Sequence, residues 1–204
     1  MQQYPGTSPA LHAIVLAAGE SRRFGAPKQL ARIAGQSLLG LAAGRAVELC
    51  GSAVTVVLGA RAAELAPLLR GLPVSVTVNP LWREGLGSSI RAGVASLPES
   101  CEGVLLMLAD QAAVSTGDLR RLADAWRGQP GGIVAASRGA IVGAPAVFPR
   151  ALFHALGELR GNRGAHELIG RHRECLMCVD MPHAAIDIDT PADLHAFAPS
   201  ESPS

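Results

Sequence analysis

The chain has 204 residues and a formal net charge of +1, and 49% of its residues are hydrophobic. A nearly neutral chain lacks the basic surface that attracts nucleic acids or acidic membranes, so neither is an expected partner. No apolar run approaches the roughly 20 residues of a membrane-spanning helix, and residues 1–9 lack the basic and apolar regions of a secretory signal. We therefore expect a cytoplasmic protein with a substantial hydrophobic core.

The first two thirds of the chain alternate apolar runs of strand length with segments of helical periodicity. Almost continuous hydrophobic runs, typical of strands buried on both faces, predict strands at Ala13–Ala18, Ala53–Leu58, Val74–Val78, Val104–Leu108 and Ile133–Ala136. Between them, helices are predicted from a Ser37 cap to about Leu49, and over Arg61–Leu69, Ser88–Leu97 and Thr116–Trp126. This alternation predicts an α/β fold with a doubly wound, mostly parallel, Rossmann-like sheet in three layers, α/β/α.

After Val142 the predicted elements become shorter and less regular. They are a strand at Ala144–Phe148, a helix from about Pro149, a helix at Ala165–Gly170, strands at Glu174–Val179 and Ala185–Ile188, and a last helix beginning at Pro191 with Asp193 in its first turn. We expect one domain over residues 12–198. The segments 1–11 and 199–204 are polar or rich in Pro and Ser, which predicts disordered tails.

A loop rich in glycine and basic residues follows the first predicted strand. Gly19 and Gly25 allow close approach of a ligand to backbone N–H groups, and Arg23 and Lys28 add positive charge. The spacing matches neither the dinucleotide-binding nor the P-loop motif. A glycine-rich turn after a strand can be purely structural, but the added cations favour a site for nucleotide phosphates.

Two acidic segments are candidates for a metal site. Asp110 follows a buried strand, where ligands collect in open α/β sheets, and a carboxylate there suits Mg²⁺. Its alternative role as a helix cap is less favoured, since Ser115 or Thr116 is better placed. In the second segment, strand alternation would put Asp187 and Asp189 on one face. We predict Asp187 as the ligand and Asp189 as second choice, with one of the two or Thr190 capping the last helix.

The four cysteines are not expected to be catalytic. Cys175 and Cys178 have the C-x-x-C spacing, but no second pair completes a tetrahedral metal site, and they lie in a predicted strand. A structural role is therefore favoured. Because His166 and His172 lie nearby in the sequence, metal or redox chemistry remains the alternative.

The segment Leu16–Lys28, which reads Leu-Ala-Ala-Gly-x-Ser-x-Arg-Phe-Gly-x-x-Lys, resembles the signature loop of the MobA-like nucleotidyltransferases. That family includes enzymes that attach CMP or GMP to molybdopterin, and the resemblance runs from about residue 12 to 197. It implies the nucleotide-diphospho-sugar transferase fold. It also implies nucleotide contacts from this loop, by Leu16, Ala17, Ala18, Gly19, Ser21, Arg23, Gly25 and Lys28.

The resemblance extends to the other two site segments. It implies that Asp110, in Leu-Ala-Asp-Gln, binds magnesium and that the Asp187 segment closes the metal site, with Arg23, Lys28 and Asp110 as the catalytic residues. It also implies that the loop after residue 78 holds the nucleotide or the pterin through Asn79, Gly87, Ser88 and Ser89, with Arg91 as a further candidate. Two serines at a helix N-terminus could equally be caps, and Trp82 could stack on a ligand or pack the loop.

The resemblance predicts Mg²⁺-dependent transfer of CMP from CTP to molybdopterin, with release of pyrophosphate and a molybdenum hydroxylase as the possible final recipient. CTP is favoured because the methyl group of Ala18 stands where the GMP-transferring members tend to have glycine. Three departures weaken the assignment of the acceptor: Ala112 replaces a usual proline, Ala144 a histidine and Asn162 an aspartate. GTP, a sugar phosphate or another phosphorylated acceptor, and a non-catalytic carrier of the molybdenum cofactor remain the alternatives.

Overall fold

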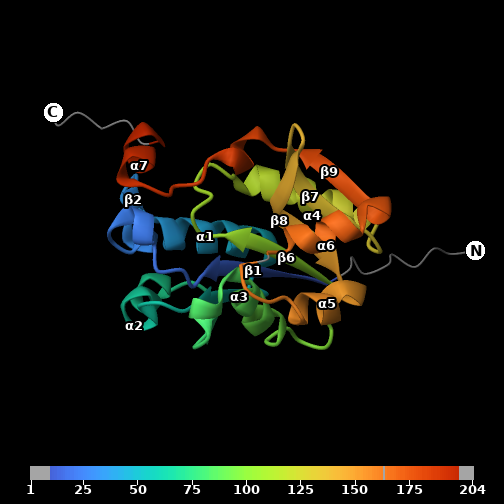
Figure 1. The fold of residues 1–204 in the computed structure, drawn as a ribbon, viewed down its shortest axis with the longest axis horizontal. Helices are drawn as coiled ribbons and strands as arrows, with labels where there is room; N and C mark the ends of the chain where they lie inside the picture. The colour runs from blue at the N-terminus through green and yellow to red at the C-terminus, as the bar shows by residue number, and fades with distance from the viewer. Residues whose placement is uncertain (1–9, 163, 198–204) are drawn as a thin grey trace, which may run out of the picture.

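The computed structural model describes residues 10–162 and 164–197, and Figure 1 shows a central sheet with helices on both faces. The sheet has seven strands in the order β5-β4-β1-β6-β8-β7-β9. Their bounds are β1 (Leu11–Ala17), β4 (Val54–Leu58), β5 (Ser75–Val78), β6 (Gly103–Leu108), β7 (Ile133–Arg138), β8 (Ile141–Pro149) and β9 (Leu176–Asp180). Every pairing is parallel except those of β8 with β6 and β7, which confirms the mostly parallel sheet.

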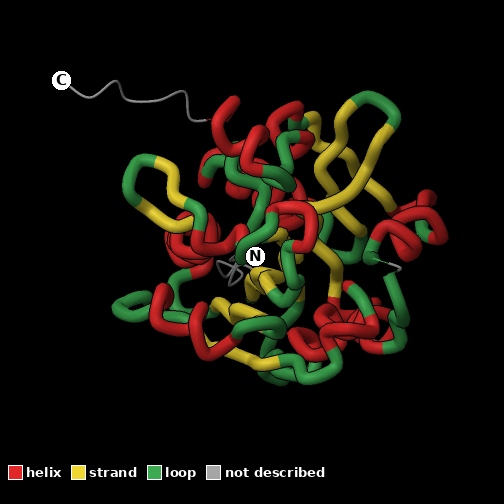
Figure 2. The backbone as a smooth tube through the Cα atoms, turned by 60° about the vertical axis from the view of Figure 1, so that its left-hand side comes forward, coloured by secondary structure: helices red, strands yellow, loops and turns green. Residues whose placement is uncertain are grey.

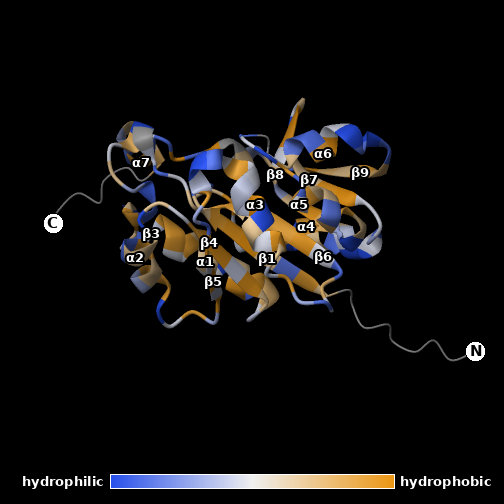
Figure 3. Ribbon diagram, turned by 60° about the horizontal axis from the view of Figure 1, so that its bottom comes forward, coloured by the Kyte–Doolittle hydropathy of each residue, from blue (hydrophilic) through white to orange (hydrophobic). Residues whose placement is uncertain are grey.

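Two hydrophobic layers cover the sheet, because successive side chains of its strands point to opposite faces. In β1, Ala13 and Val15 belong to one buried cluster, whereas Ile14 and Leu16 belong to the other. The first cluster is covered by α1 (Leu38–Cys50), α2 (Ala62–Leu65) and α4 (Thr116–Gly128), and the second by α3 (Leu86–Val94), α5 (Phe153–Gly157) and α6 (His166–Arg171). Figure 3 shows the hydrophobic strands between helices with hydrophilic outer faces.

Two smaller elements complete the described chain. Strands β2 (Arg32–Ile33) and β3 (Gln36–Ser37) form a separate hairpin, and α7 (Pro191–Phe197) lies beside it in Figure 1. A small third cluster centred on Leu38, Ala112 and Ile188 packs against these elements. In Figure 2, the turn that joins β7 and β8 projects from the body of the molecule.

Local sequence signals account for several helix ends. Ser37 caps α1 by accepting a hydrogen bond from the Gly40 N–H, as predicted. Ser115 caps α4 in a reciprocal arrangement with Asp118. The helix predicted over 61–69 is instead split into α2 and a 3₁₀ segment, Ala66–Leu69, where Pro67 contributes no N–H to continue the helix.

Several further predictions made from the sequence need correction. Strand β5 is largely exposed, because among the described residues it pairs only with β4 and so forms an edge of the sheet. Helix α3 begins at Leu86, two residues before the predicted start. Leu11, expected in the tail, begins β1, whereas residues 1–9 and 198–204 lie outside the described residues.

Another correction concerns the predicted strand Ala185–Ile188. The structure has a 3₁₀ turn over Pro182–Ala185, and residues 186–189 have no strand partner. Alternation along a strand therefore does not place Asp187 and Asp189 on one face. In addition, Cys175 ends a 3₁₀ turn (Arg173–Cys175) rather than lying in β9.

The topology brings the two best sequence motifs to one edge of the sheet. Strand β1 lies between β4 and β6, and the strand order reverses there. In an open α/β sheet, such a reversal leaves a crevice at the carboxyl ends of the strands. The loop after β1 and Asp110 after β6 consequently meet. Within the described part of the chain, no helix is both long and apolar enough to span a membrane.

Candidate active site

A cavity of about 730 Å³ lies where the loop after β1 meets the end of β6. This volume is in the range of sites that bind small molecules and cofactors. Many of the predicted site residues line it, namely Leu16, Ala17, Ala18, Gly19, Ser21, Arg23, Lys28, Ser89, Asp110 and Asp189. Trp82 and Asn162 line it as well.

Some predicted residues lie outside this lining. Gly25 lines a neighbouring cavity of about 540 Å³, which shares Ser21 and Trp82 with the first. Asn79 is only 3% exposed, and its amide donates to the hydroxyl oxygens of Ser88 (2.8 Å) and Ser89 (3.1 Å). Asn79 therefore holds the serine pair in place within the protein.

The serines are not the caps of α3 that the sequence suggested. Gly85 is the residue at the N-cap position, with φ of 105°. The hydroxyl of Ser88 donates toward the carbonyl oxygens of Leu81 (2.9 Å) and Gly85 (2.8 Å), which fixes the loop before the helix. Of the pair, only Ser89 lines the main cavity, so its hydroxyl is the one placed to meet a ligand.

The loop that carries Ser89 is in close contact with the segment that the resemblance assigned to the acceptor. The N–H of Gly87 donates to the carbonyl oxygen of Gly161 at 3.0 Å. A Cβ atom on Gly85 would come within 2.6 Å of the Gly161 carbonyl carbon, so a larger residue there would displace the segment. Asn162 is thereby held at the same cavity as Ser89.

Gln29, which the sequence analysis missed, shapes the glycine-rich loop. Its buried amide nitrogen donates to the carbonyl oxygens of Ala17 (3.2 Å) and Gly19 (3.0 Å), and its amide oxygen accepts from Ser21 (3.1 Å). These bonds tie both sides of the loop to a single side chain. The sequence signal that could have identified Gln29 is its position directly after Lys28, the basic residue of the motif. In the structure both residues lie in a short 3₁₀ turn, Lys28–Leu30.

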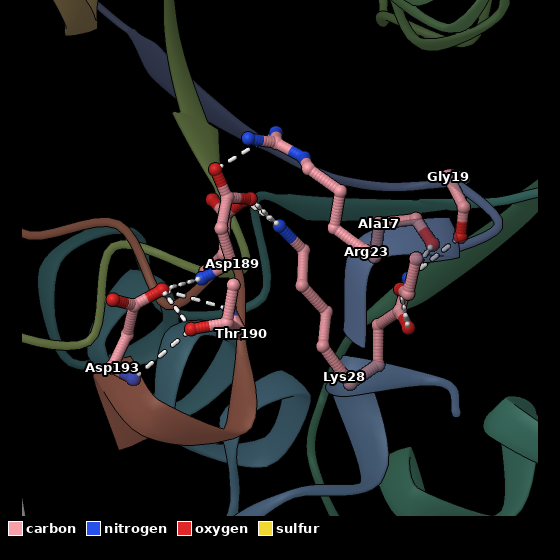
Figure 4. A network of polar contacts seen from close by, with 10 residues as sticks. Ala17, Gly19, Arg23, Lys28, Asp189, Thr190 and Asp193 are labelled. Atoms are coloured by element: carbon pink, nitrogen blue, oxygen red, sulfur yellow. Dashed lines mark hydrogen bonds and ion pairs between the residues drawn. The ribbon is translucent and has the colours of Figure 1, made fainter. Parts of the chain in front are cut away.

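Lys28 lies at the centre of a charged network (Figure 4). Its ammonium group forms ion pairs with Asp110 and, at 2.9 Å, with Asp189. Burial lowers the pKa of Lys28, but the two carboxylates outweigh it and raise the pKa above its ordinary value, so the group stays charged. Lys28 is also the single lysine in the sequence.

Arg23 joins the same network from the more exposed side. Its guanidinium lies 2.8 Å from the second carboxylate oxygen of Asp189, and 74% of its side chain is exposed. Figure 4 shows Arg23 and Lys28 approaching Asp189 from the same side. An exposed guanidinium can reach a phosphate at low cost, because it gives up little in leaving a solvated ion pair.

Asp110 has one carboxylate oxygen to spare. Oδ2 accepts from Lys28, whereas Oδ1 is buried and has no hydrogen-bond partner among the described residues. A buried carboxylate oxygen without a partner is costly unless a ligand satisfies it. Together with the nearby acids, this oxygen fits a hard divalent cation that takes one or two carboxylates and completes its shell with phosphate oxygens and water.

The acidic segment is held against Asp110 by its own backbone. The Ile188 N–H donates to the Asp110 carbonyl oxygen at 3.1 Å, and the Ile188 side chain is fully buried. Thr190 caps α7 in a reciprocal arrangement with Asp193, so neither Asp187 nor Asp189 serves as the cap. Of the two acids, Asp189 lines the cavity and makes direct ion pairs.

Asp187 is an exposed residue, but its carboxylate interacts electrostatically with the charged groups of the site. Desolvation, together with the negative charges of Asp110 and Asp189, raises its pKa from the usual 3.8 to about 6. Lys28 and Arg138 oppose the shift without cancelling it. A third carboxylate therefore lies close enough to be repelled by the first two. A bound cation would relieve this repulsion, so the three carboxylates together favour cation binding more than one carboxylate does.

The raised pKa predicts an unusual pH dependence of stability. Between about pH 4 and pH 6 the folded chain retains a proton on Asp187 that the unfolded chain has lost, so this group destabilises the fold as the pH rises. With divalent cations removed by a chelator, the melting temperature of Asp187→Asn should exceed that of wild type at pH values above about 6. The difference should be smallest near pH 4. The prediction is wrong if the difference from wild type is the same at both pH values.

The cysteine motif lies away from this network. Side-chain ligand atoms of His172, Glu174 and Cys175 lie within 4.8 Å of one another, whereas Cys178 is exposed on β9. Cys178 is not part of this group of potential ligands. The structural role stays a prediction, and the alternative of a metal is confined to the first cysteine and its two neighbours.

Comparison with known proteins identifies the family. The model of the MobA-like NTP transferase domain matches residues 13–175. Rv0371c from Mycobacterium tuberculosis H37Rv is 31% identical with a TM-score of 0.77, over 93% of this chain and 98% of that chain. Its complex with manganese matches with a TM-score of 0.76 and 28% identity, over 95% of this chain and 100% of that chain. Molybdopterin-guanine dinucleotide biosynthesis protein A from Archaeoglobus fulgidus shares the fold, with 14% identity, a TM-score of 0.72, and 92% and 97% coverage.

Two curated relatives match over part of their lengths. Nicotine blue oxidoreductase of Paenarthrobacter nicotinovorans is 33% identical over 130 residues, which cover 63% of this chain and 62% of that protein. The bifunctional IPC transferase and DIPP synthase of Rubrobacter xylanophilus is 46% identical over 94 residues, or 43% of this chain and 21% of that protein. The family match spans most of the chain, and the sheet, the glycine-rich loop and the acidic edge agree with it: the chain belongs to the MobA-like NTP transferase family and is a nucleotidyltransferase.

Proposed function

We propose that this nucleotidyltransferase moves CMP from CTP to the terminal phosphate of molybdopterin and releases pyrophosphate, with Mg²⁺ bound by Asp110 and Asp187 and with Asp189 as the alternative ligand. The observation that carries the proposal is the position of Lys28 between Asp110 and Asp189, in a cavity walled by the glycine-rich loop. It supports a site that handles phosphate groups and a cation together. A cytoplasmic location and delivery of the product to a molybdenum hydroxylase belong to the same proposal.

The reaction joins two anions, so its barrier is mainly charge repulsion and misalignment. An oxygen of the acceptor phosphate forms a bond to the α-phosphorus, and the bond from that phosphorus to the bridging oxygen of pyrophosphate breaks. A bound divalent cation would neutralise phosphate charge at this centre. Lys28 and Arg23 would turn from Asp189 toward the phosphates, and the loop N–H groups around Gly19 would stabilise the leaving pyrophosphate.

The preference for CTP depends on the wall of the cavity near Ala18. Its side chain lines the cavity and is 5% exposed, so the methyl group is fixed against the core. A methyl group at this position narrows the cavity, so the smaller pyrimidine base fits better than a purine. The acceptor is less constrained, and a sugar phosphate or another phosphorylated acceptor is the first alternative to molybdopterin.

Pyrophosphate release from the purified protein tests the proposal. With Mg²⁺ and intact molybdopterin, we expect release with CTP and at least roughly tenfold less with GTP or ATP, since crowding of one methyl group is worth about one factor of ten. Equal release with all three nucleotides would contradict the base assignment. Release with a sugar phosphate in place of molybdopterin would change the acceptor, and Mg²⁺-dependent CTP binding without release from any acceptor would favour the carrier alternative.

A further inference from the structure

Gln111 links three segments around the candidate metal site. Its side chain is buried, with 7% of the residue exposed. Nε2 donates to the carbonyl oxygens of Ala144 in β8, at 2.9 Å, and of Ala184 in the 3₁₀ turn, at 3.2 Å. The loop after β6, strand β8 and the start of the acidic segment are therefore joined by one amide group.

Two of the contacts that hold the acidic segment come from Gln111 and Asp110. Ala184 is held through the Gln111 side chain, and Ile188 is held by its backbone bond to Asp110. Residues 186–189, which lie in and just after this span, form neither helix nor strand, so no regular hydrogen-bond ladder supports them. The position of Asp187 relative to Asp110 consequently depends on these two anchors, together with the ion pairs of Asp189.

In the part of the chain that the structure describes, the hydrogen bonds of the Gln111 side chain involve its amide nitrogen and not its amide oxygen. Both accepting carbonyl groups need an N–H donor, which the amide supplies, whereas its own Oε1 is buried without a hydrogen-bond partner among the described residues. An unsatisfied buried oxygen destabilises the fold. An apolar side chain of equal length would remove that cost, but it would also leave the carbonyl oxygens of Ala144 and Ala184 without this donor, so we expect a moderate loss of stability when the anchor is lost.

We propose that Gln111 is a positioning residue, which sets the spacing between Asp110 and the acidic carboxylates by holding Ala184. The inference rests on the proposed function, because the carboxylates are metal ligands only there. It assigns Gln111 no contact with substrate, and indeed Gln111 is absent from the lining of the main cavity. Groups of this kind that orient metal ligands typically change metal affinity by about 10- to 100-fold.

Gln111→Met in the full-length protein tests the proposal, with Mn²⁺ as the spectroscopic probe. Titration followed by electron paramagnetic resonance should show Mn²⁺ binding weakened by about 10- to 100-fold. At a temperature where the variant is folded, hydrogen exchange should become faster at Ile188 than at the backbone amides of the central strand β1. Gln36→Met, on the exposed hairpin strand β3, is the matched control and should change neither.

Gln111→Leu adds no charge near the site and also lacks the amide donor, so it should weaken Mn²⁺ binding as well. Binding within twofold of wild type in both folded variants would overturn the proposal while leaving the metal site intact. Absence of Mn²⁺ binding in the wild type would overturn the metal site itself and, with it, this inference. The two failures are therefore distinguishable.

Discussion

Asp110→Asn is expected to lower nucleotidyl transfer by roughly a thousandfold or more, the largest effect of any single substitution in this chain. Asparagine has almost the same shape, so the Ile188 backbone contact and the fold should persist. What disappears is the charge of a carboxylate whose second oxygen is buried without a partner. Such an oxygen gains most from a bound cation, and its loss removes both metal binding and charge neutralisation at the phosphates.

Two measurements separate this effect from loss of structure. Pyrophosphate release at saturating nucleotide reports turnover, and a Mn²⁺ titration of the same protein reports the metal site. Asp124→Asn is the matched control, because Asp124 is an exposed acid on α4 that pairs with Arg127, and neither residue lines the cavity. A folded Asp110→Asn protein with turnover within about tenfold of wild type would contradict the metal role.

Much of this site could be predicted because its signals are local. The end of β1, the glycine-rich loop and Asp110 are adjacent in the sequence to long apolar runs, and a parallel sheet brings the ends of such strands together. The sequence positions of Arg23, Lys28 and Asp110 therefore predict that these residues line one cavity, as they do in the structure. The cap of α1 at Ser37 was predictable for the same reason.

The acidic segment was harder, because its conformation is set by distant contacts. The predicted strand Ala185–Ile188 alternates in sequence, but it pairs with no strand among the described residues and is held by contacts with Asp110 and Gln111 instead. Propensity therefore pointed to a ladder that tertiary structure does not provide. Asp189 consequently makes the ion pairs with Lys28 and Arg23, although Asp187 was the favoured acid.

Asn79 and Gln29 show the complementary difficulty. Both are polar residues beside a motif, and the sequence cannot tell whether such a residue faces a ligand or supports the loop that does. Their burial and their hydrogen bonds place them in the supporting role, since each satisfies groups of the protein itself. Spacing in the sequence predicts which segment a side chain belongs to, whereas tertiary packing decides whether the side chain points toward the ligand or into the protein.

Lys28→Met should separate two roles that one ammonium group combines. Turnover is expected to fall by roughly a hundredfold, as for loss of one charged stabiliser of the transition state. Mn²⁺ affinity should hold or rise, because Asp110 and Asp189 lose the cation that now pairs with both and their mutual repulsion increases. A lysine that merely supported the carboxylates would predict the opposite for metal binding.

Lys28→Arg makes the test sharper. Arginine keeps the charge but spreads it over a planar fork, and the partly buried position between two carboxylates suits the compact ammonium group of the chain's single lysine. We therefore expect Lys28→Arg to recover less than about a tenth of wild-type turnover, whereas Arg70→Met, at an exposed site outside the cavity, should leave turnover unchanged. Full activity in Lys28→Arg would show that charge alone suffices. Weakened Mn²⁺ binding in Lys28→Met would contradict a competition between lysine and metal for the same carboxylates.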